Sequence, residues 1–139
     1  MKRVLLDTGP LVAILSERDH HHDECVEQLR QLAPPLLTCW PVITEAAWLL
    51  RNDLAAVQRM LAGFEVGLLE LLPLDEEAAP WISSFVARYA DLGAQLADAC
   101  LVYLAEREGI ETVFTLDRRD FTVYRYGKNK SFTLIPGLA

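Results

Sequence analysis

The residues of this sequence that could carry chemistry are acidic, and two of them follow short apolar runs. Asp7 comes directly after residues 4–6, and Asp117 comes directly after residues 113–116. In an open sheet of parallel strands, ligands bind beyond the carboxyl ends of the strands, where such side chains meet. Each aspartate alone could simply cap the turn that follows it. The pair together favours a functional site at one edge of a sheet.

Two further acids lie beside the apolar faces of predicted helices. Glu45 follows Val42 by three residues and precedes Leu49 by four, so it adjoins the apolar side of its helix. A carboxylate is seldom buried without a partner, and no nearby lysine or arginine stands out as one. Asp98 adjoins Ala97 near the start of another helix, where the helix dipole also favours a negative charge. A helix-start acid is therefore the simpler alternative for Asp98.

The elements that must position these acids alternate along the chain. Apolar runs predict strands over residues 3–6, 36–39, 68–72, 112–116 and 132–135. Apolar spacing of three and four predicts helices over residues 11–15, 23–32, 41–50, 54–64, 76–89 and 96–108. Pro80 lies inside the fifth of these helices and could kink it, whereas Gly109 suits the end of the sixth. Alternating strands and helices predict a layered α/β fold with a largely parallel sheet.

The acids belong to a longer pattern that runs through the chain. Its pieces are Leu-Asp-Thr at 6–8, Thr-Glu at 44–45, Leu-Ala-Asp-Ala at 96–99 and Thr-Leu-Asp-Arg-Arg-Asp-Phe at 115–121. In this order and at these distances they resemble a PIN domain, most of all the VapC toxins of bacterial and archaeal toxin–antitoxin pairs. The resemblance implies a single PIN domain over residues 1–139. It also implies a three-layer α/β/α fold with a central, mostly parallel sheet of four or five short strands.

The resemblance also implies a metal site. It assigns a catalytic, metal-binding role to four acids: Asp7, Glu45, Asp98 and Asp117. Thr8 and Thr115 match hydroxyl positions that support the metal site, and Asp120 is expected only to lie outside the direct ligands. Hard oxygen ligands suit Mg²⁺ or Mn²⁺ rather than Zn²⁺. Without metal, the clustered charges are expected to repel one another and to destabilise the fold.

The charge of the chain is unevenly distributed. Its 13 basic and 20 acidic side chains give a net charge of −7, which by itself argues against binding to nucleic acid. Residues 118–139, however, contain five bases and one acid, a net charge of +4. Arg118 and Arg119 are expected to contact substrate phosphates. Tyr124 and Tyr126 lie among these bases and could either stack on unpaired nucleobases or belong to the core.

Histidines and tryptophans have simpler explanations. Consecutive residues point in different directions on a helix, so a solvated helix entry is favoured over a metal cluster for His20, His21 and His22. The three tryptophans are expected to serve the core or an oligomer interface: Trp40, Trp48 and Trp81.

Thiols and the N-terminus favour an intracellular, cytoplasmic protein. Cys25, Cys39 and Cys100 form an odd set without metal-binding spacing, so buried free thiols are expected. Asp7 interrupts the apolar stretch after Lys2, and no small-residue cleavage site follows, which argues against a signal peptide. No apolar run approaches the roughly 18 residues that a membrane helix needs, so no membrane association is expected.

The function implied by the resemblance is a divalent-metal-dependent endoribonuclease that acts as the toxin of a type II pair. It implies an RNA substrate, a cognate antitoxin that blocks the site, and a homodimer. Two alternatives stay open: a PIN nuclease of RNA processing without a toxin role, and a non-catalytic scaffold, against which the four acids count. A phosphatase of the haloacid-dehalogenase type needs a second aspartate two residues after the first, where this chain has Gly9. The RNA target is left open.

Overall fold

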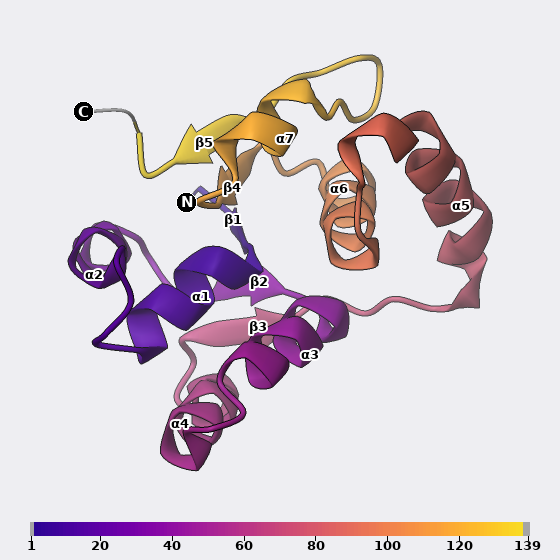
Figure 1. Ribbon diagram of the computed structural model, residues 1–139. Helices are drawn as coiled ribbons and strands as arrows, with labels where there is room; N and C mark the ends of the chain where they lie inside the picture. Colours follow the sequence, from indigo (N-terminus) through magenta and orange to yellow (C-terminus); the bar gives the residue numbers. More distant parts are fainter. Residues whose placement is uncertain (1, 138–139) are drawn as a thin grey trace.

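The central feature of the computed structural model is a five-stranded, wholly parallel sheet with the strand order β3-β2-β1-β4-β5 (Figure 1). The structure describes residues 2–137, so residues 1, 138 and 139 of the predicted domain lie outside the described residues. The strands are short, as predicted: β1 (Val4–Leu6), β2 (Leu36–Thr38), β3 (Leu69–Leu71), β4 (Thr112–Phe114) and β5 (Thr133–Ile135).

Seven α-helices connect these strands within the described part of the chain. They are α1 (Thr8–Leu15), α2 (His22–Arg30), α3 (Trp40–Leu49), α4 (Leu54–Glu65), α5 (Ala79–Arg88), α6 (Leu96–Glu108) and α7 (Arg118–Val123). Figure 1 shows α1 and α2 on one side of the sheet and α5 and α6 on the other. The strand order explains this arrangement, because the chain builds the sheet from β1 outwards to β3 and then crosses back to add β4 and β5 on the other side of β1. The three-layer α/β/α prediction is therefore confirmed.

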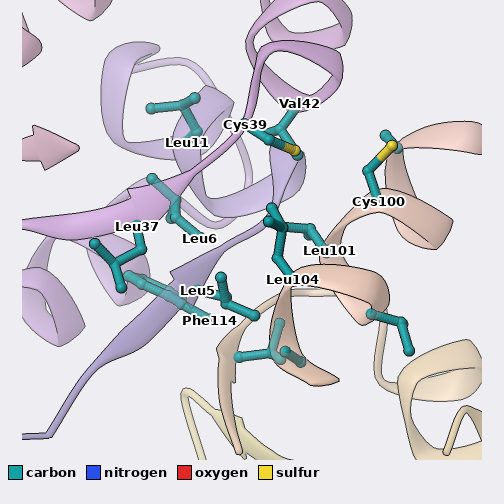
Figure 2. Close-up of a cluster of buried hydrophobic side chains, with 14 of the residues drawn as sticks. Leu5, Leu6, Leu11, Leu37, Cys39, Val42, Cys100, Leu101, Leu104 and Phe114 are labelled. Carbon is teal, nitrogen blue, oxygen red and sulfur yellow. The ribbon is translucent and has the colours of Figure 1, made fainter. Parts of the chain in front are cut away.

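The core fills both faces of the sheet. All residues of β1, β2 and β4 are buried, as expected for parallel strands covered on both sides. Figure 2 shows Leu11 of α1 and Val42 of α3 in this cluster, together with Leu101 and Leu104 of α6. The central strands are thus held between helices from the two halves of the chain.

The three cysteines lie in this interior as free thiols, as expected: Cys25, Cys39 and Cys100. Burial raises the pKa of Cys25 to about 11 and that of Cys39 to about 12. Burial also raises the pKa of Cys100.

Two helices differ from the sequence-based expectation. The helix expected over residues 76–89 is divided into a 3₁₀ turn (Glu76–Ala78) and α5, and Pro80 lies in the first turn of α5. Proline is tolerated there because its missing N–H would have no helical partner. The other difference is α7, which was not predicted. It begins where the Asp120 amide donates to Asp117 Oδ1 at 3.1 Å.

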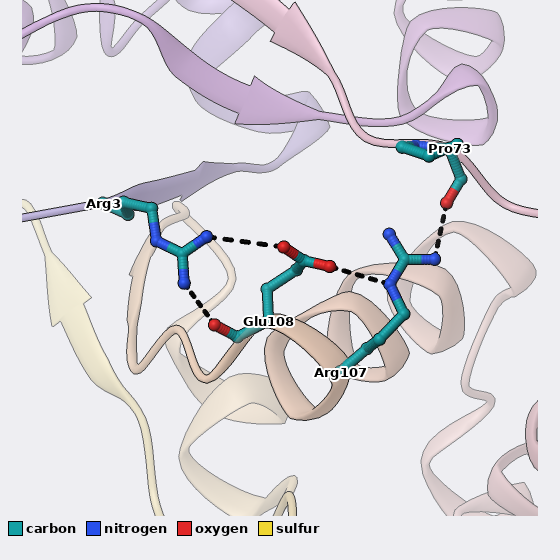
Figure 3. A network of polar contacts seen from close by, with 4 residues as sticks. All are labelled: Arg3, Pro73, Arg107 and Glu108. Carbon is teal, nitrogen blue, oxygen red and sulfur yellow. Dashed lines mark hydrogen bonds and ion pairs between the residues drawn. The ribbon is translucent and has the colours of Figure 1, made fainter.

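A polar network ties together the start of β1, the end of α6 and the segment after β3 (Figure 3). The Arg3 guanidinium lies 3.4 Å from the Glu108 carboxylate and also donates to the Glu108 backbone carbonyl. Arg107 donates to the same carboxylate at 2.9 Å and to the Pro73 carbonyl at 2.7 Å. The Arg107 hydrogen bond is the largest cause of a lowered pKa at Glu108. Since these side chains lie at the surface and are partly solvated, each ion pair contributes at most about 1 kcal/mol.

No helix within residues 2–137 has both the length and the apolar character needed to cross a bilayer.

Candidate active site

A cavity of about 490 Å³ opens at the carboxyl ends of β1 and β4 and is lined by acids. These two strands are where the sheet order changes direction, which is where ligands bind in open α/β sheets. The structure brings the four predicted acids to this one cavity and adds a fifth: Asp7, Glu45, Asp98, Asp117 and Asp120.

Asp7 is buried and does not cap the helix that follows it. Only 6% of its surface is exposed, and its side chain makes no capping hydrogen bond to α1. Its backbone N–H donates to the Phe114 carbonyl at 2.9 Å, which continues the pairing of β1 with β4. Its Oδ2 instead accepts a hydrogen bond from the Thr115 hydroxyl at 2.7 Å. Burial, the largest cause, raises the pKa of Asp7 to about 6.

Thr115 links the ends of the two central strands. Its fully buried hydroxyl donates to Asp7 and accepts from the Asp117 backbone N–H at 2.9 Å. Asp117 in turn uses Oδ1 to cap α7, so capping explains one of its oxygens and leaves the other available. One threonine therefore fixes the relative position of two acids that are 110 residues apart in the sequence.

Three of the acids lie especially close together. One carboxylate oxygen from each of Asp98, Asp117 and Asp120 lies within 4.8 Å of the others. Asp120 is therefore closer to the cluster than the sequence predicted, because the unforeseen helix α7 places it in the turn capped by Asp117. Burial and, after it, the charge of Asp7 raise the pKa of Asp98 to about 7. Burial and the charge of Asp117 raise that of Asp120 as well.

The donor set fits a divalent cation. All of its members are oxygen atoms, and carboxylates in close groups suit hard cations such as Mg²⁺ or Mn²⁺. Thr8 also lines the cavity, and its buried hydroxyl has no hydrogen-bond partner among the described residues. Buried hydroxyls normally have a partner, so this oxygen is available to a bound cation, a water or a substrate oxygen. Glu45 reaches the same cavity from α3 without belonging to the closest group.

Tyr124 is a site residue that sequence reasoning missed. Its hydroxyl donates to Asp98 Oδ2 at 2.8 Å. Tyr124 is completely buried and Tyr126 is 7% exposed, so the interpretation that they stack on nucleobases is wrong and the core interpretation is correct. Burial and the charge of Asp98 raise the pKa of Tyr124, so its hydroxyl stays protonated and can donate. The only available signal was a tyrosine in a position where a purely apolar core would use phenylalanine.

The two arginines expected to contact phosphate lie beside the cavity without lining it. Arg118 is half-buried and donates to the Pro136 carbonyl at 2.8 Å, whereas Arg119 is exposed. Arg119 is thus the freer of the two for a partner outside the chain.

The histidines and tryptophans also have clear positions. His20 and His21 are exposed and α2 begins at His22, which agrees with a solvated helix entry. Trp81 stacks on Phe85 with ring centroids 5.5 Å apart, as a partly buried residue at the core. Trp40 and Trp48 are 56% and 64% exposed, so the core does not explain them.

Comparison with known proteins agrees with this geometry. Residues 4–127 match the family model of the PIN domain. The chain belongs to the PIN-domain family. It is 30% identical over 138 residues to ribonuclease VapC26 of Mycobacterium tuberculosis, an alignment that covers 96% of this chain and 100% of VapC26. The prediction of a VapC-type PIN domain is therefore confirmed.

Solved structures show the same fold. VapC20 of M. tuberculosis, described as a sarcin–ricin loop cleaving toxin, aligns with a TM-score of 0.76 and 15% identity, covering 84% of this chain and 91% of VapC20. The DNA-bound VapBC complex of Salmonella typhimurium aligns with a TM-score of 0.60 and 21% identity, covering 96% of this PIN domain and 97% of the matched chain. At these identities the two structures establish a shared fold.

Proposed function

We propose that this VapC-type PIN domain, residues 1–139, is a divalent-metal-dependent endoribonuclease and the toxin of a type II toxin–antitoxin pair. The observation that carries the proposal is the cavity at the end of β1 and β4, where five carboxylates meet and oxygens of three lie within 4.8 Å of one another. Such a concentration of like charge is costly unless a cation neutralises it. The similarity to a ribonuclease of the VapC type supports RNA as the substrate.

In this proposal the acids coordinate Mg²⁺ or Mn²⁺, and the Thr115 hydroxyl orients two of them by hydrogen bonds. The metal ligands are Asp7, Glu45, Asp98 and Asp117, with Asp120 close enough to join them. When bound, the cation would activate water and neutralise charge on the scissile phosphodiester. Thr115 keeps Asp7 and Asp117 in register by its two hydrogen bonds. The free hydroxyl of Thr8 is placed to donate to a water or a phosphate oxygen.

RNA would be held by the basic part of the chain. Arg119 is exposed in the first turn of α7, between Asp117 and Asp120 in the sequence, and is our first candidate for a phosphate contact. Arg118 is the second candidate, because its guanidinium has N–H donors besides the one that bonds the Pro136 carbonyl. A contact of this kind makes RNA affinity fall with salt concentration.

A cognate antitoxin is the proposed inhibitor. The VapC-type family and the fold shared with a VapBC complex support such a partner. The acidic cavity is complementary to a basic side chain, so we propose that the antitoxin covers the cavity with a positive group. An RNA substrate and three free thiols fit a cytoplasmic location.

A homodimer is proposed on the basis of an apolar groove of about 640 Å³ between α3 and α6. Trp40, Trp48 and Leu96 line it and are more than half exposed. Large exposed apolar groups at one place are typical of an interaction surface. The groove shares Glu45 and Gln95 with the acidic cavity, so a second copy bound there would lie beside the active site.

Cleavage assays test the proposed activity. The protein is incubated with transfer RNA, ribosomal RNA, a messenger RNA and a sarcin–ricin loop hairpin, with Mg²⁺ or Mn²⁺. We expect one of these RNAs to be cut internally, and we expect EDTA or Asp7→Asn to abolish cutting.

Cleavage that persists in EDTA would contradict the metal mechanism. No cleavage of any RNA would favour the non-catalytic scaffold. Cleavage without growth arrest on expression would favour a PIN nuclease of RNA processing.

A further inference from the structure

The hydroxyl group of Tyr124 belongs to a fully buried side chain and contacts the acidic cluster. Its ring lies in an aromatic cluster, with centroids 5.0 Å from Phe85, 5.0 Å from Tyr89 and 5.1 Å from Phe121. The whole side chain is buried, and phenylalanine would fill the same apolar space. A buried hydroxyl is costly unless it is hydrogen-bonded. Its bond is to one carboxylate of the cluster, at 2.8 Å.

This bond limits what the Asp98 carboxylate can do. The torsion that rotates a carboxylate is broad and has no steep preference of its own. With Oδ2 held by Tyr124, rotation is restricted and the other oxygen is left for a ligand. Hydrogen bonds to charged acceptors are stronger than neutral ones, so the restraint is substantial.

Asp7, which lines the same cavity, is held in the same manner. Its Oδ2 accepts from Thr115 at 2.7 Å. Two carboxylates of the cavity, the buried Asp7 and the half-buried Asp98, are thus each held through one oxygen by the hydroxyl of a buried side chain. Thr115 directly follows β4 and Tyr124 directly follows α7, so the segment that carries Asp117 and Asp120 lies between the two restraints along the chain.

A second tyrosine of the same aromatic cluster makes a different contact. The Tyr89 hydroxyl accepts from the Arg125 backbone N–H at 3.1 Å. Tyr89 belongs to the same aromatic cluster and is 7% exposed, but its hydroxyl bonds the backbone rather than an acid. The two tyrosines therefore differ in what their hydroxyls hold, and they form a matched pair for an experiment.

We infer that Tyr124 is a positioning residue that holds the Asp98 carboxylate in the orientation that binds the cation. This inference rests on the proposed function, because it assumes that the cluster binds a divalent ion. A residue of the aromatic core thereby becomes part of the proposed metal site, as the group that orients one of its carboxylates.

The test compares Tyr124→Phe with Tyr89→Phe in the full chain. Both variants remove one buried hydroxyl from the same cluster. The affinity for Mn²⁺ alone is measured by isothermal titration calorimetry, at a temperature well below the melting point of every variant. Removal of groups that orient metal ligands typically costs about 10-fold or more in metal affinity. We therefore expect Tyr124→Phe to weaken Mn²⁺ binding by about 10-fold and Tyr89→Phe to change it by less than about twofold.

The outcomes separate this inference from the proposed function. Equal Mn²⁺ affinity in Tyr124→Phe and the wild type would overturn the inference while leaving the metal site intact. Equal losses in both variants would also overturn it, because the aromatic cluster would then matter only as packing. If the wild type binds no Mn²⁺, the proposed function fails first. In a cleavage assay, an activity deficit of Tyr124→Phe that disappears at saturating Mn²⁺ would support a role in positioning Asp98.

Discussion

Thr112 and Thr115 lie three residues apart on the same chain segment, and their hydroxyls have different surroundings. Both side chains are buried, but Thr115 bonds Asp7 and the Asp117 amide, whereas the Thr112 hydroxyl has no partner among the described residues. Valine has the same shape as threonine without the hydroxyl. A comparison of the two positions therefore separates the contribution of the Thr115 hydrogen bonds to stability from the contribution of its packing.

We expect Thr115→Val to lower the free energy of unfolding of the metal-free protein by roughly 1–3 kcal/mol, because a buried carboxylate loses its donor. Thr112→Val should be neutral or stabilising, since it removes an unsatisfied buried group. Urea denaturation of both variants in EDTA measures the difference. Equal effects at the two positions would contradict the assigned hydrogen bonds.

A second prediction concerns the charge of Asp98. Its pKa in the folded protein is raised from 3.8 to about 7, so the folded state binds this proton more tightly than the unfolded state does. The ionised form therefore destabilises the metal-free fold above pH 7, and this cost disappears as the pH falls towards 4. We expect Asp98→Asn to stabilise the metal-free protein by about 1–3 kcal/mol at pH 8, to gain little near pH 4.5, and to abolish cleavage.

Thermal melts in EDTA at the two pH values provide the measurement. Asparagine keeps an oxygen that can accept from Tyr124, so the variant tests charge rather than lost packing. A melting temperature of Asp98→Asn at or below that of the wild type at pH 8 would mean that the acids do not repel one another as their positions imply.

The sequence predicted the acids of the cavity but not the side chains that hydrogen-bond to them. Four acids could be located from the sequence, because two directly follow apolar strands and two adjoin the apolar faces of helices. All four line one cavity in the structure: Asp7, Glu45, Asp98 and Asp117. Their role as metal ligands stays a prediction. The contact of Tyr124 with Asp98 spans 26 residues and depends on how α7 packs, which no local pattern encodes.

At the scale of elements, the sheet and the long helices were predictable because each buries a continuous apolar face. Helix α7 was not, since its six residues contribute a single buried apolar side chain, Phe121, and so have no periodicity to detect. Capping by Asp117 starts this helix, and the same turn brings Asp120 into the acidic cluster. The position of Asp120 beside Asp98 and Asp117 therefore depends on an element that the sequence did not predict.

The end of α6 gives a prediction at this scale. Gly109 adopts the left-handed conformation at φ +67°, and no atom lies within 4 Å of the position where a Cβ would be. Alanine would meet no steric neighbour, so its effect isolates backbone strain. We expect Gly109→Ala to cost roughly 1–2 kcal/mol of unfolding free energy, and Gly109→Asn to cost clearly less, because asparagine visits this region more readily. Chemical denaturation of the two variants checks the order, and equal costs would contradict it.

At the scale of the whole molecule, the exposed groove between α3 and α6 predicts self-association. Trp48 is 64% exposed on this groove, whereas Val66 is 78% exposed just after α4 and does not line it. We expect the wild type to sediment as a dimer. Trp48→Glu should weaken the dimer more than about 10-fold, as is typical for a buried interface tryptophan, and Val66→Glu should leave it unchanged. A monomeric wild type would contradict the homodimer proposal.

The reactivity of the buried cysteines can be used to measure local opening of this protein. Cys39 directly follows β2, Cys100 lies two residues after Asp98, and Cys25 lies in the separate helix α2. A shielded thiol of high pKa does not react with disulfide reagents at neutral pH until the chain around it opens. Labelling rates, resolved by mass spectrometry, would thus time the opening of two regions in one sample. If Mn²⁺ slows the labelling of Cys100 far more than that of Cys25, then the ion suppresses local opening around the acidic cavity rather than unfolding of the entire chain.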